Sequence, residues 1–218
     1  MDSDYPRVAS INLLNRISEQ SVFKECKNIM YRCVHSKEDS KKIKSRKTRN
    51  IQNEKLAIDL LNTLSTIYAM EKGYPVFKCT DGFIRDILSS RLKIRNLRSE
   101  LEEMLPSMNR VLELVNPREV VMVIDKPIPW SARLARKIGE FKWSVQVKTL
   151  VGRCDSELIK LGGNGFYIAS SDIMVLQSIN KAIDIPGLYL ETFLGSLPNV
   201  CDLEKMTPVW KKEICRIE

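Results

Sequence analysis

The chain has 218 residues, with 35 Lys or Arg against 27 Asp or Glu, and 44% of its residues are apolar. This length suits one domain, or one domain with a small appendage, and the composition is that of a globular protein. No apolar run approaches the roughly 18 residues that span a bilayer. Residues 1–30 mix charged and apolar positions, unlike a signal peptide. We therefore expect a soluble cytoplasmic protein without a membrane anchor.

The chain contains one histidine, His35, and six cysteines. A single imidazole excludes zinc sites with two histidines and the facial iron site, which also needs two. No two cysteines have the C-x-x-C spacing of a structural zinc site, so we expect reduced, structural thiols. Any catalysis would then depend on carboxylates.

The apolar pattern changes along the chain. Apolar residues at steps of three and four predict helical structure over residues 8–34. From about residue 53 onward, short apolar runs predict strands at 56–58, 76–79, 120–124, 143–147 and 166–169. Helical spacing predicts helices over 60–70, 95–115 (bent near Pro106), 131–141, 155–161 and 171–182. Strands that alternate with helices favour an α/β domain with a mostly parallel sheet.

This pattern divides the chain into three parts. Residues 1–52 are expected to form a helical N-terminal segment with a basic linker, and residues 53–185 the α/β domain. Residues 186–218 form a C-terminal tail whose role no pattern indicates.

Basic residues concentrate between the first two parts. Seven basic residues stand against two acidic ones between Lys37 and Arg49. Such a segment can neutralise phosphates of a nucleic acid, and it is equally typical of a solvated linker. The candidates for nucleic-acid binding are Lys41, Lys42, Lys44, Arg46, Lys47 and Arg49.

Three predicted strands are followed by an aspartate: Asp59, Asp125 and Asp172. The carboxyl ends of parallel strands share one edge of the sheet, where such folds bind ligands. Carboxylates gathered there repel one another unless a cation lies between them, and Mg²⁺ or Mn²⁺ prefers such oxygen ligands. Each aspartate alone is also a common helix N-cap. Asn62, one helical turn after Asp59, and Ser170 could both face the same site.

Five short motifs resemble an uncharacterised prokaryotic family whose C-terminal part is a PIN-like domain. They occur in the family's order at residues 58–62 (IDLLN), 80–86 (TDGFIRD), 124–128 (IDKPI), 155–159 (DSELI) and 169–172 (ASSD). PIN-like domains are three-layer α/β/α sandwiches, and their active members are Mg²⁺- or Mn²⁺-dependent ribonucleases. The resemblance therefore implies RNA as the partner, and it is compatible with a homodimer.

The resemblance assigns the chemistry to four acids: Asp59, Asp125, Asp155 and Asp172, with Asn62 and Ser170 as helpers. Asp59, Asp125 and Asp172 would hold the metal. Asp155 enters through the resemblance alone and would complete the cluster or orient the attacking water.

A family-specific motif adds Asp81, Arg85 and Asp86. Arg85 could bind a phosphate oxygen or pair with a neighbouring carboxylate, and we favour the ion pair.

The chain departs from the family at three positions. Leu60 replaces a glycine after the first aspartate, where it could narrow the site, and Leu61 replaces an aromatic residue. Lys126 replaces a small residue and could contact substrate phosphate.

Because the chain retains the four acids, we predict a metal-dependent nuclease acting on RNA rather than DNA, with a non-catalytic nucleic-acid- or protein-binding module as the alternative. A phosphatase that uses an aspartate as phosphoryl acceptor is disfavoured, because Pro127 occupies the position of its second acid.

Overall fold

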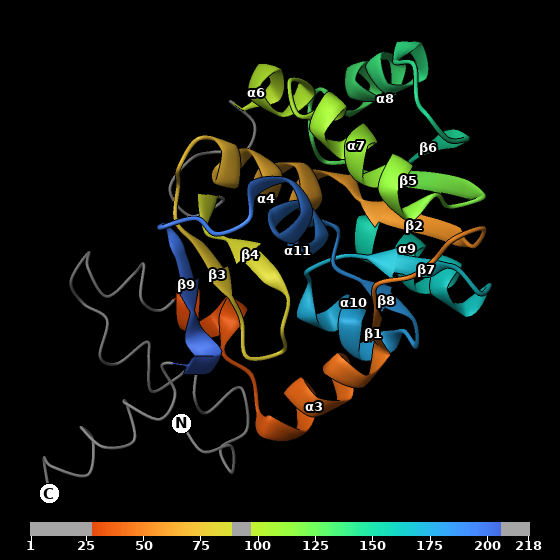
Figure 1. Ribbon diagram of the computed structural model, residues 1–218. Helices are drawn as coiled ribbons and strands as arrows, with labels where there is room; N and C mark the ends of the chain where they lie inside the picture. Colours follow the sequence, from red (N-terminus) through yellow and green to blue (C-terminus); the bar gives the residue numbers. More distant parts are fainter. Residues whose placement is uncertain (1–27, 89–96, 206–218) are drawn as a thin grey trace, which may run out of the picture.

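The computed structural model describes residues 28–88 and 97–205 of the chain (Figure 1). Within these residues, the central sheet has six strands, and all neighbouring strands are parallel. Their order across the sheet is β1 (Lys47–Thr48), β8 (Ala182–Ile183), β7 (Tyr167–Ala169), β2 (Lys55–Asp59), β5 (Glu119–Asp125) and β6 (Val147–Gly152). The predicted α/β fold with a parallel sheet is confirmed.

Helices cover both faces of this sheet. Successive residues of a strand face opposite sides, so Leu56 and Ile58 of β2 are buried under one helical layer and Ala57 under the other. The first layer contains α4 (Leu60–Glu71), α6 (Arg98–Glu102), α7 (Leu105–Val115), α8 (Ser131–Glu140) and α11 (Ile185–Tyr189). The second contains α3 (Lys37–Arg46), α9 (Cys154–Gly163) and α10 (Ile173–Ser178). The protein is therefore a three-layer α/β/α sandwich, as predicted.

A small second sheet lies beside the central one (Figure 1). Its order is β4 (Ile84–Asp86), β3 (Val76–Lys78) and β9 (Val200–Asp202), with β3 antiparallel to β4 and parallel to β9. The turn between β3 and β4 contains Gly82 at a φ of 80°, a left-handed conformation that glycine adopts without strain. The prediction foresaw β3 and this turn but neither β4 nor β9.

The prediction that the basic segment is a linker is wrong, because its residues form α3 and β1. The Ser36 hydroxyl caps α3 by accepting a hydrogen bond from the Asp39 backbone N–H, and Ile43 on the same helix is buried. β1 then pairs with β8 at the edge of the central sheet. The basic segment is part of the folded domain rather than a connection to it.

Two other predicted elements differ from the structure. In place of a strand at 143–147, the chain forms β6 at Val147–Gly152, an edge strand whose mixed polar and apolar residues gave no clear pattern. The helix predicted over 171–182 is shorter, because Arg46 donates hydrogen bonds to the carbonyls of Leu176 and Gln177 at the end of α10. A longer helix would have used these carbonyls itself.

The ends of the described chain also refine the predicted boundaries. Residues 28–33 are helical, and the remainder of the helix expected over 8–34 lies outside the described residues. Part of the expected tail belongs to the fold: α11, the π-helix at Leu190–Leu194 and β9 follow residue 184, and Tyr189 and Leu190 are buried in the core. Across the described residues, the structure contains no helix that is long and apolar enough to cross a membrane.

Candidate functional site

Four neighbouring strands of the central sheet bring aspartates to one edge. β2 ends at Asp59 and β5 at Asp125, Asp172 follows β7, and Asp155 follows β6 in the first turn of α9. Strands β7, β2, β5 and β6 are adjacent and parallel, so their carboxyl ends point the same way. The fold thus places all four predicted acids at the sheet edge where α/β proteins bind ligands.

Asp59 is the most buried of the four, with 4% of its surface exposed. It caps α4, and its carboxylate accepts hydrogen bonds from the Asn62 side chain at 2.6 Å, the Asn62 backbone N–H at 3.4 Å and the Ser170 hydroxyl at 3.2 Å. Burial nevertheless raises the pKa of Asp59 from 3.8 to about 6, against the opposing effect of these hydrogen bonds. Asn62 and Ser170 therefore take the supporting positions that the sequence predicted.

Ser170 links Asp59 to the loop that carries Asp172. Its hydroxyl donates to Asp59 and accepts from the Asp172 backbone N–H at 3.1 Å. Asp172 is half-buried and caps α10, accepting from the backbone N–H groups of Met174 at 2.7 Å and Val175 at 3.3 Å. One oxygen of Asp172 makes both bonds, which leaves its second oxygen available to a ligand.

Asp155 is exposed and lies within electrostatic reach of two other acids. Partial burial raises the pKa of Asp155, and the negative charges of Asp172 and Asp125 raise it further. Asp125 is half-buried and accepts a long hydrogen bond, 3.5 Å, from the Cys154 backbone N–H at the start of α9. Carboxylates from three different strands therefore repel one another.

Cys154 is a residue of this cluster that sequence reasoning missed. It is 8% exposed, its thiol hydrogen-bonds to Asp59, and burial and the charges of Asp59, Asp155 and Asp125 raise the pKa of the thiol. The sequence predicted a structural cysteine here. Its position one residue before Asp155 was the available signal, but a lone cysteine at the start of a helix carries no recognisable pattern.

None of the four acids forms an ion pair with Lys or Arg within residues 28–88 and 97–205. The donor set consists of carboxylate, amide and hydroxyl oxygens, which suits a hard cation such as Mg²⁺ or Mn²⁺. Across the described part of the chain, however, no three His, Cys, Asp or Glu side chains are arranged as a ready-made metal site. Mg²⁺ commonly binds through one or two carboxylates with water and substrate phosphate, so the donor chemistry fits without such a group.

The motif around Arg85 connects the second sheet to the loop that carries Asp172. Arg85 is 1% exposed and forms a two-pronged ion pair with Asp81, at 2.7 and 2.6 Å, which confirms the ion-pair interpretation. Its Nε also donates to the Ser171 carbonyl at 2.7 Å, between Ser170 and Asp172. Asp86 accepts from two α4 hydroxyls, those of Ser65 and Thr66, so it ties β4 to α4.

One strand-end acid was not predicted. Asp184 follows β8, but its oxygens accept from Lys47, from the Ile84 N–H and from the Gly187 N–H. A Cβ at Gly187 would lie 2.4 Å from Asp184, so only glycine fits there. This acid is neutralised within the fold, and the two-residue strand before it was too short to recognise.

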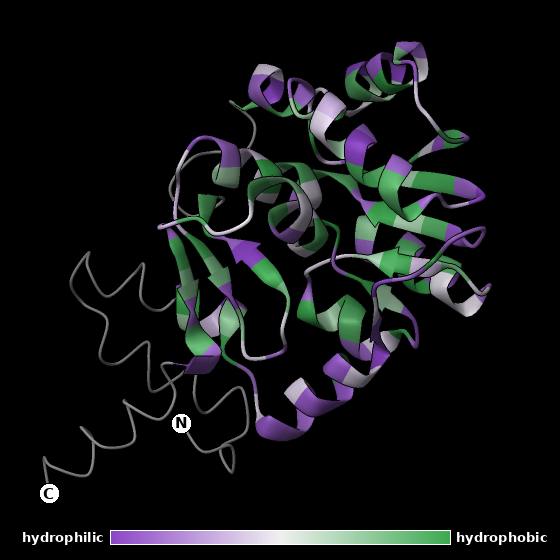
Figure 2. Ribbon diagram, in the orientation of Figure 1, coloured by the Kyte–Doolittle hydropathy of each residue, from purple (hydrophilic) through white to green (hydrophobic). Residues whose placement is uncertain are grey.

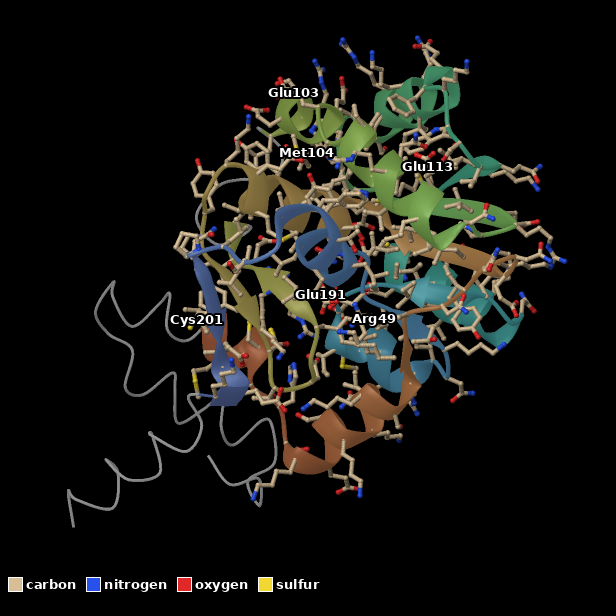
Figure 3. All side chains as sticks on the ribbon, viewed as in Figure 1. Arg49, Glu103, Met104, Glu113, Glu191 and Cys201 are labelled. Carbon is tan, nitrogen blue, oxygen red and sulfur yellow. The ribbon has the colours of Figure 1, made fainter. Side chains whose placement is uncertain are left out.

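The basic candidates divide into two groups. Four of them contact other parts of the chain. Lys44 contacts Glu204, and Arg46 contacts the end of α10. Lys47 contacts Asp184 and the Gly82 carbonyl, and Arg49 contacts Glu191. Figure 3 shows Arg49 beside Glu191. Lys41 and Lys42 are exposed on the hydrophilic α3 (Figure 2), and Lys126 is exposed just after Asp125. Among the described residues, these three make no ion pair.

The leucine that replaces the family's glycine does not narrow the site. Leu60 is fully buried in the core of the first helical layer, and Leu61 is 6% exposed in the same core. Both side chains therefore point into the protein at the start of α4, while Asp59 and Asn62 face the cluster.

Residues 48–188, which include the four acids and the central sheet except Lys47 of β1, match the family described as "Domain of unknown function (DUF5616)". The chain belongs to this family. It is also similar to uncharacterized protein MJ0935 of Methanocaldococcus jannaschii, with 26% identity over 162 residues that cover 72% of this chain and 75% of that protein. No solved structure matches the chain. Neither description names an activity, so the PIN-like assignment stays a prediction.

Proposed function

We propose that this protein is a divalent-metal-dependent nuclease that hydrolyses phosphodiester bonds, acting on RNA through a PIN-like domain. The observation that carries the proposal is the set of four aspartates at one sheet edge, without a basic partner among the described residues. Clustered carboxylates without counter-charges are costly in a folded protein, and active sites are where such cost is found. A bound cation would offset their repulsion.

The aspartates have different roles in this proposal. Asp59, Asp125 and Asp172 would hold Mg²⁺ or Mn²⁺, which would neutralise charge on the phosphodiester and assist activation of the attacking water. Asn62 and Ser170 fix the Asp59 carboxylate by donating to it. Asp155 is exposed and its pKa is raised, so it is suited to accept the proton of the attacking water.

Three exposed lysines would contact the nucleic acid. Lys126 directly follows Asp125 and is suited to contact a phosphate beside the scissile bond. Lys41 and Lys42 lie on the exposed face of α3, in the same helical layer as α9 and α10. Asp155 lies in the first turn of α9, and Asp172 caps α10. The two lysines would bind the phosphate backbone further along the strand, independently of sequence.

The test is cleavage of single-stranded RNA in the presence of Mg²⁺ or Mn²⁺, with DNA of the same sequence as comparison. Wild type is expected to cut RNA, and Asp125→Asn to lose the activity. Glu140→Gln is the matched control, because it removes one exposed carboxylate at the end of α8, on the helix that precedes β6. Equal cleavage by wild type and Asp125→Asn would refute the enzyme proposal.

The alternative is a binding module on the same fold that hydrolyses nothing. It is favoured by one observation: within the described residues, no group of side chains is ready-made to hold a metal ion. Calorimetric titration with Mn²⁺ separates the two proposals. Millimolar Mn²⁺ that binds wild type but not Asp125→Asn supports the nuclease, whereas RNA binding without Mn²⁺ binding or cleavage supports the module.

A further inference from the structure

Two buried cysteines lie together outside the acidic cluster. Cys33 ends the helical residues 28–33, Cys79 follows β3, and both are free thiols with 0% exposure. They pack with Phe77, Ile87 and Leu203 in a separate small core next to the second sheet. Neither thiol has a part in the proposed chemistry at the sheet edge.

The backbone holds the two cysteines side by side. The N–H of Thr80, the residue after Cys79, donates to the Cys33 carbonyl at 3.0 Å. The Thr80 hydroxyl accepts in turn from the His35 N–H at 2.9 Å, which fixes the chain two residues after Cys33 as well. The α-carbons of Cys33 and Cys79 therefore flank one backbone hydrogen bond, a spacing that suits the range of about 4.4–6.8 Å that a disulfide spans.

The two thiols are chemically unequal. They hydrogen-bond to each other, and this bond, together with the positive charges of Arg85 and Arg32, lowers the pKa of Cys33 despite its burial. Burial raises the pKa of Cys79, and so does its role as the proton donor to Cys33; the Phe77 carbonyl, at 3.4 Å, is the alternative acceptor for the same S–H. A thiolate with a lowered pKa beside a second thiol is the arrangement of a nucleophilic and a resolving cysteine.

We propose that Cys33 and Cys79 form a reversible disulfide when the protein meets a hydroperoxide. The Cys33 thiolate attacks one peroxide oxygen, the O–O bond breaks, and Cys33 becomes a sulfenic acid as hydroxide leaves. The Cys79 sulfur then attacks the Cys33 sulfur, the S–O bond breaks, and the hydroxyl leaves as water with the Cys79 proton. In total, two thiols are oxidised and one hydrogen peroxide is reduced to two waters. This inference does not depend on the proposed nuclease function.

The disulfide would attach the helical residues 28–33 covalently to the second sheet. Without it, the Thr80 hydrogen bonds and the small core of five buried residues join these parts. Closing the intervening loop restricts the unfolded chain, so oxidation is expected to raise the melting temperature and dithiothreitol to reverse the rise.

The test uses the full, reduced chain treated with hydrogen peroxide, a small oxidant that reaches buried sulfur with little opening of the fold. Remaining thiols are blocked with N-ethylmaleimide and the digest is mapped by mass spectrometry. We expect one linked peptide pair containing Cys33 and Cys79, and the loss of two of the six thiols. Cys33 and Cys79 both recovered as maleimide adducts, while other cysteines are oxidised, would overturn the proposal.

Two variants sharpen the result. Cys79→Ser is expected to leave Cys33 as a sulfenic acid that dimedone traps. Cys201→Ser is the matched control: Cys201 lies on β9 opposite Phe77 (Figure 3), in contact with the same small core, and burial raises the pKa of its thiol. This control is expected to form the Cys33–Cys79 bond as wild type does, and a wild-type bond that includes Cys201 instead contradicts the proposal.

Discussion

Asp59→Asn is expected to stabilise the protein near neutral pH when no divalent metal is present. Burial raises the pKa of Asp59 from 3.8 to about 6, so the folded state disfavours its negative charge. A shift of about two pKa units corresponds to about 3 kcal/mol of unfolding free energy. Asparagine removes this cost but accepts one hydrogen bond fewer from Asn62 or Ser170, a loss of about 1 kcal/mol. We therefore expect a net gain of about 2 kcal/mol.

The gain should depend on pH in a defined direction. Between pH 3.8 and about 6, folded Asp59 is protonated while unfolded Asp59 is not, so the folded state binds more protons. The stability of the wild type therefore falls as pH rises through this window. The advantage of Asp59→Asn should be complete above about pH 6 and should shrink as the pH falls toward 3.8, below which the carboxyl is protonated in both states.

Urea unfolding followed by circular dichroism at pH 4.5 and pH 7.5, with a chelator, measures this effect. Asp86→Asn is the control, because Asp86 is equally buried, at 1% exposure, but accepts from Ser65, Thr66 and the Leu88 N–H. An amide cannot accept from all of these donors, so the control should be destabilised at both pH values. If Asp59→Asn loses stability at pH 7.5 as the control does, the folded state does not disfavour the ionised form of Asp59, and the reasoning fails.

Three further predictions test the site and its support. If Asp155 is the proton acceptor of the proposed nuclease, Asp155→Asn is expected to lower kcat for RNA cleavage by roughly 100- to 10,000-fold with little effect on KM. Steady-state kinetics with Mn²⁺ measures both constants. Replacing Lys41 and Lys42 together by Ala should reduce the slope of log RNA affinity against log salt concentration by about 1.4, since each phosphate contact to a single strand contributes about 0.7. RNA-binding titrations at several salt concentrations measure this slope. An unchanged slope would exclude both lysines from the interface. Arg85→Met should destabilise the protein by about 3–5 kcal/mol in urea unfolding, because the buried Asp81 loses its two-pronged ion pair and keeps the His35 imidazole, at 3.3 Å. Adding Asp81→Leu should recover part of the loss.

The sequence predicted the sheet and most of the cluster because the signals were local. Val120 to Ile124 form an apolar run typical of a central strand, and Asp125 directly after it had to lie at the sheet edge. Asp59 and Asp172 follow shorter runs of the same kind. Asp155 needed the family resemblance, since β6 is an edge strand with exposed polar residues and no apolar run leads to it.

The second sheet could not be predicted from local pattern. Its strands have three residues each, too few to show a period of two, and β3 at Val76–Lys78 pairs with β9 at Val200–Asp202 across more than half of the chain. β8 has only two residues, and the first of them, Ala182, was the last residue of a predicted helix. A tertiary contact decides here between a longer helix and a new strand: Arg46 binds the end of α10. Such a contact is not visible in the sequence.

The buried acids of this protein fall into two groups, those with a basic partner and those without one among the described residues. Asp81 is paired with Arg85 and Asp184 with Lys47, whereas Asp59 and Asp86 accept only from uncharged donors. Of the last two, Asp59 is the one at the sheet edge, and burial raises its pKa. The fold can therefore supply counter-charges to buried carboxylates. Arg85 lies near the cluster, because its Nε holds the Ser171 carbonyl in the loop before α10, yet its guanidinium is committed to Asp81. This arrangement positions the loop that carries Asp172 while leaving the charge of the cluster for a ligand to neutralise, which is the property that a cation site requires.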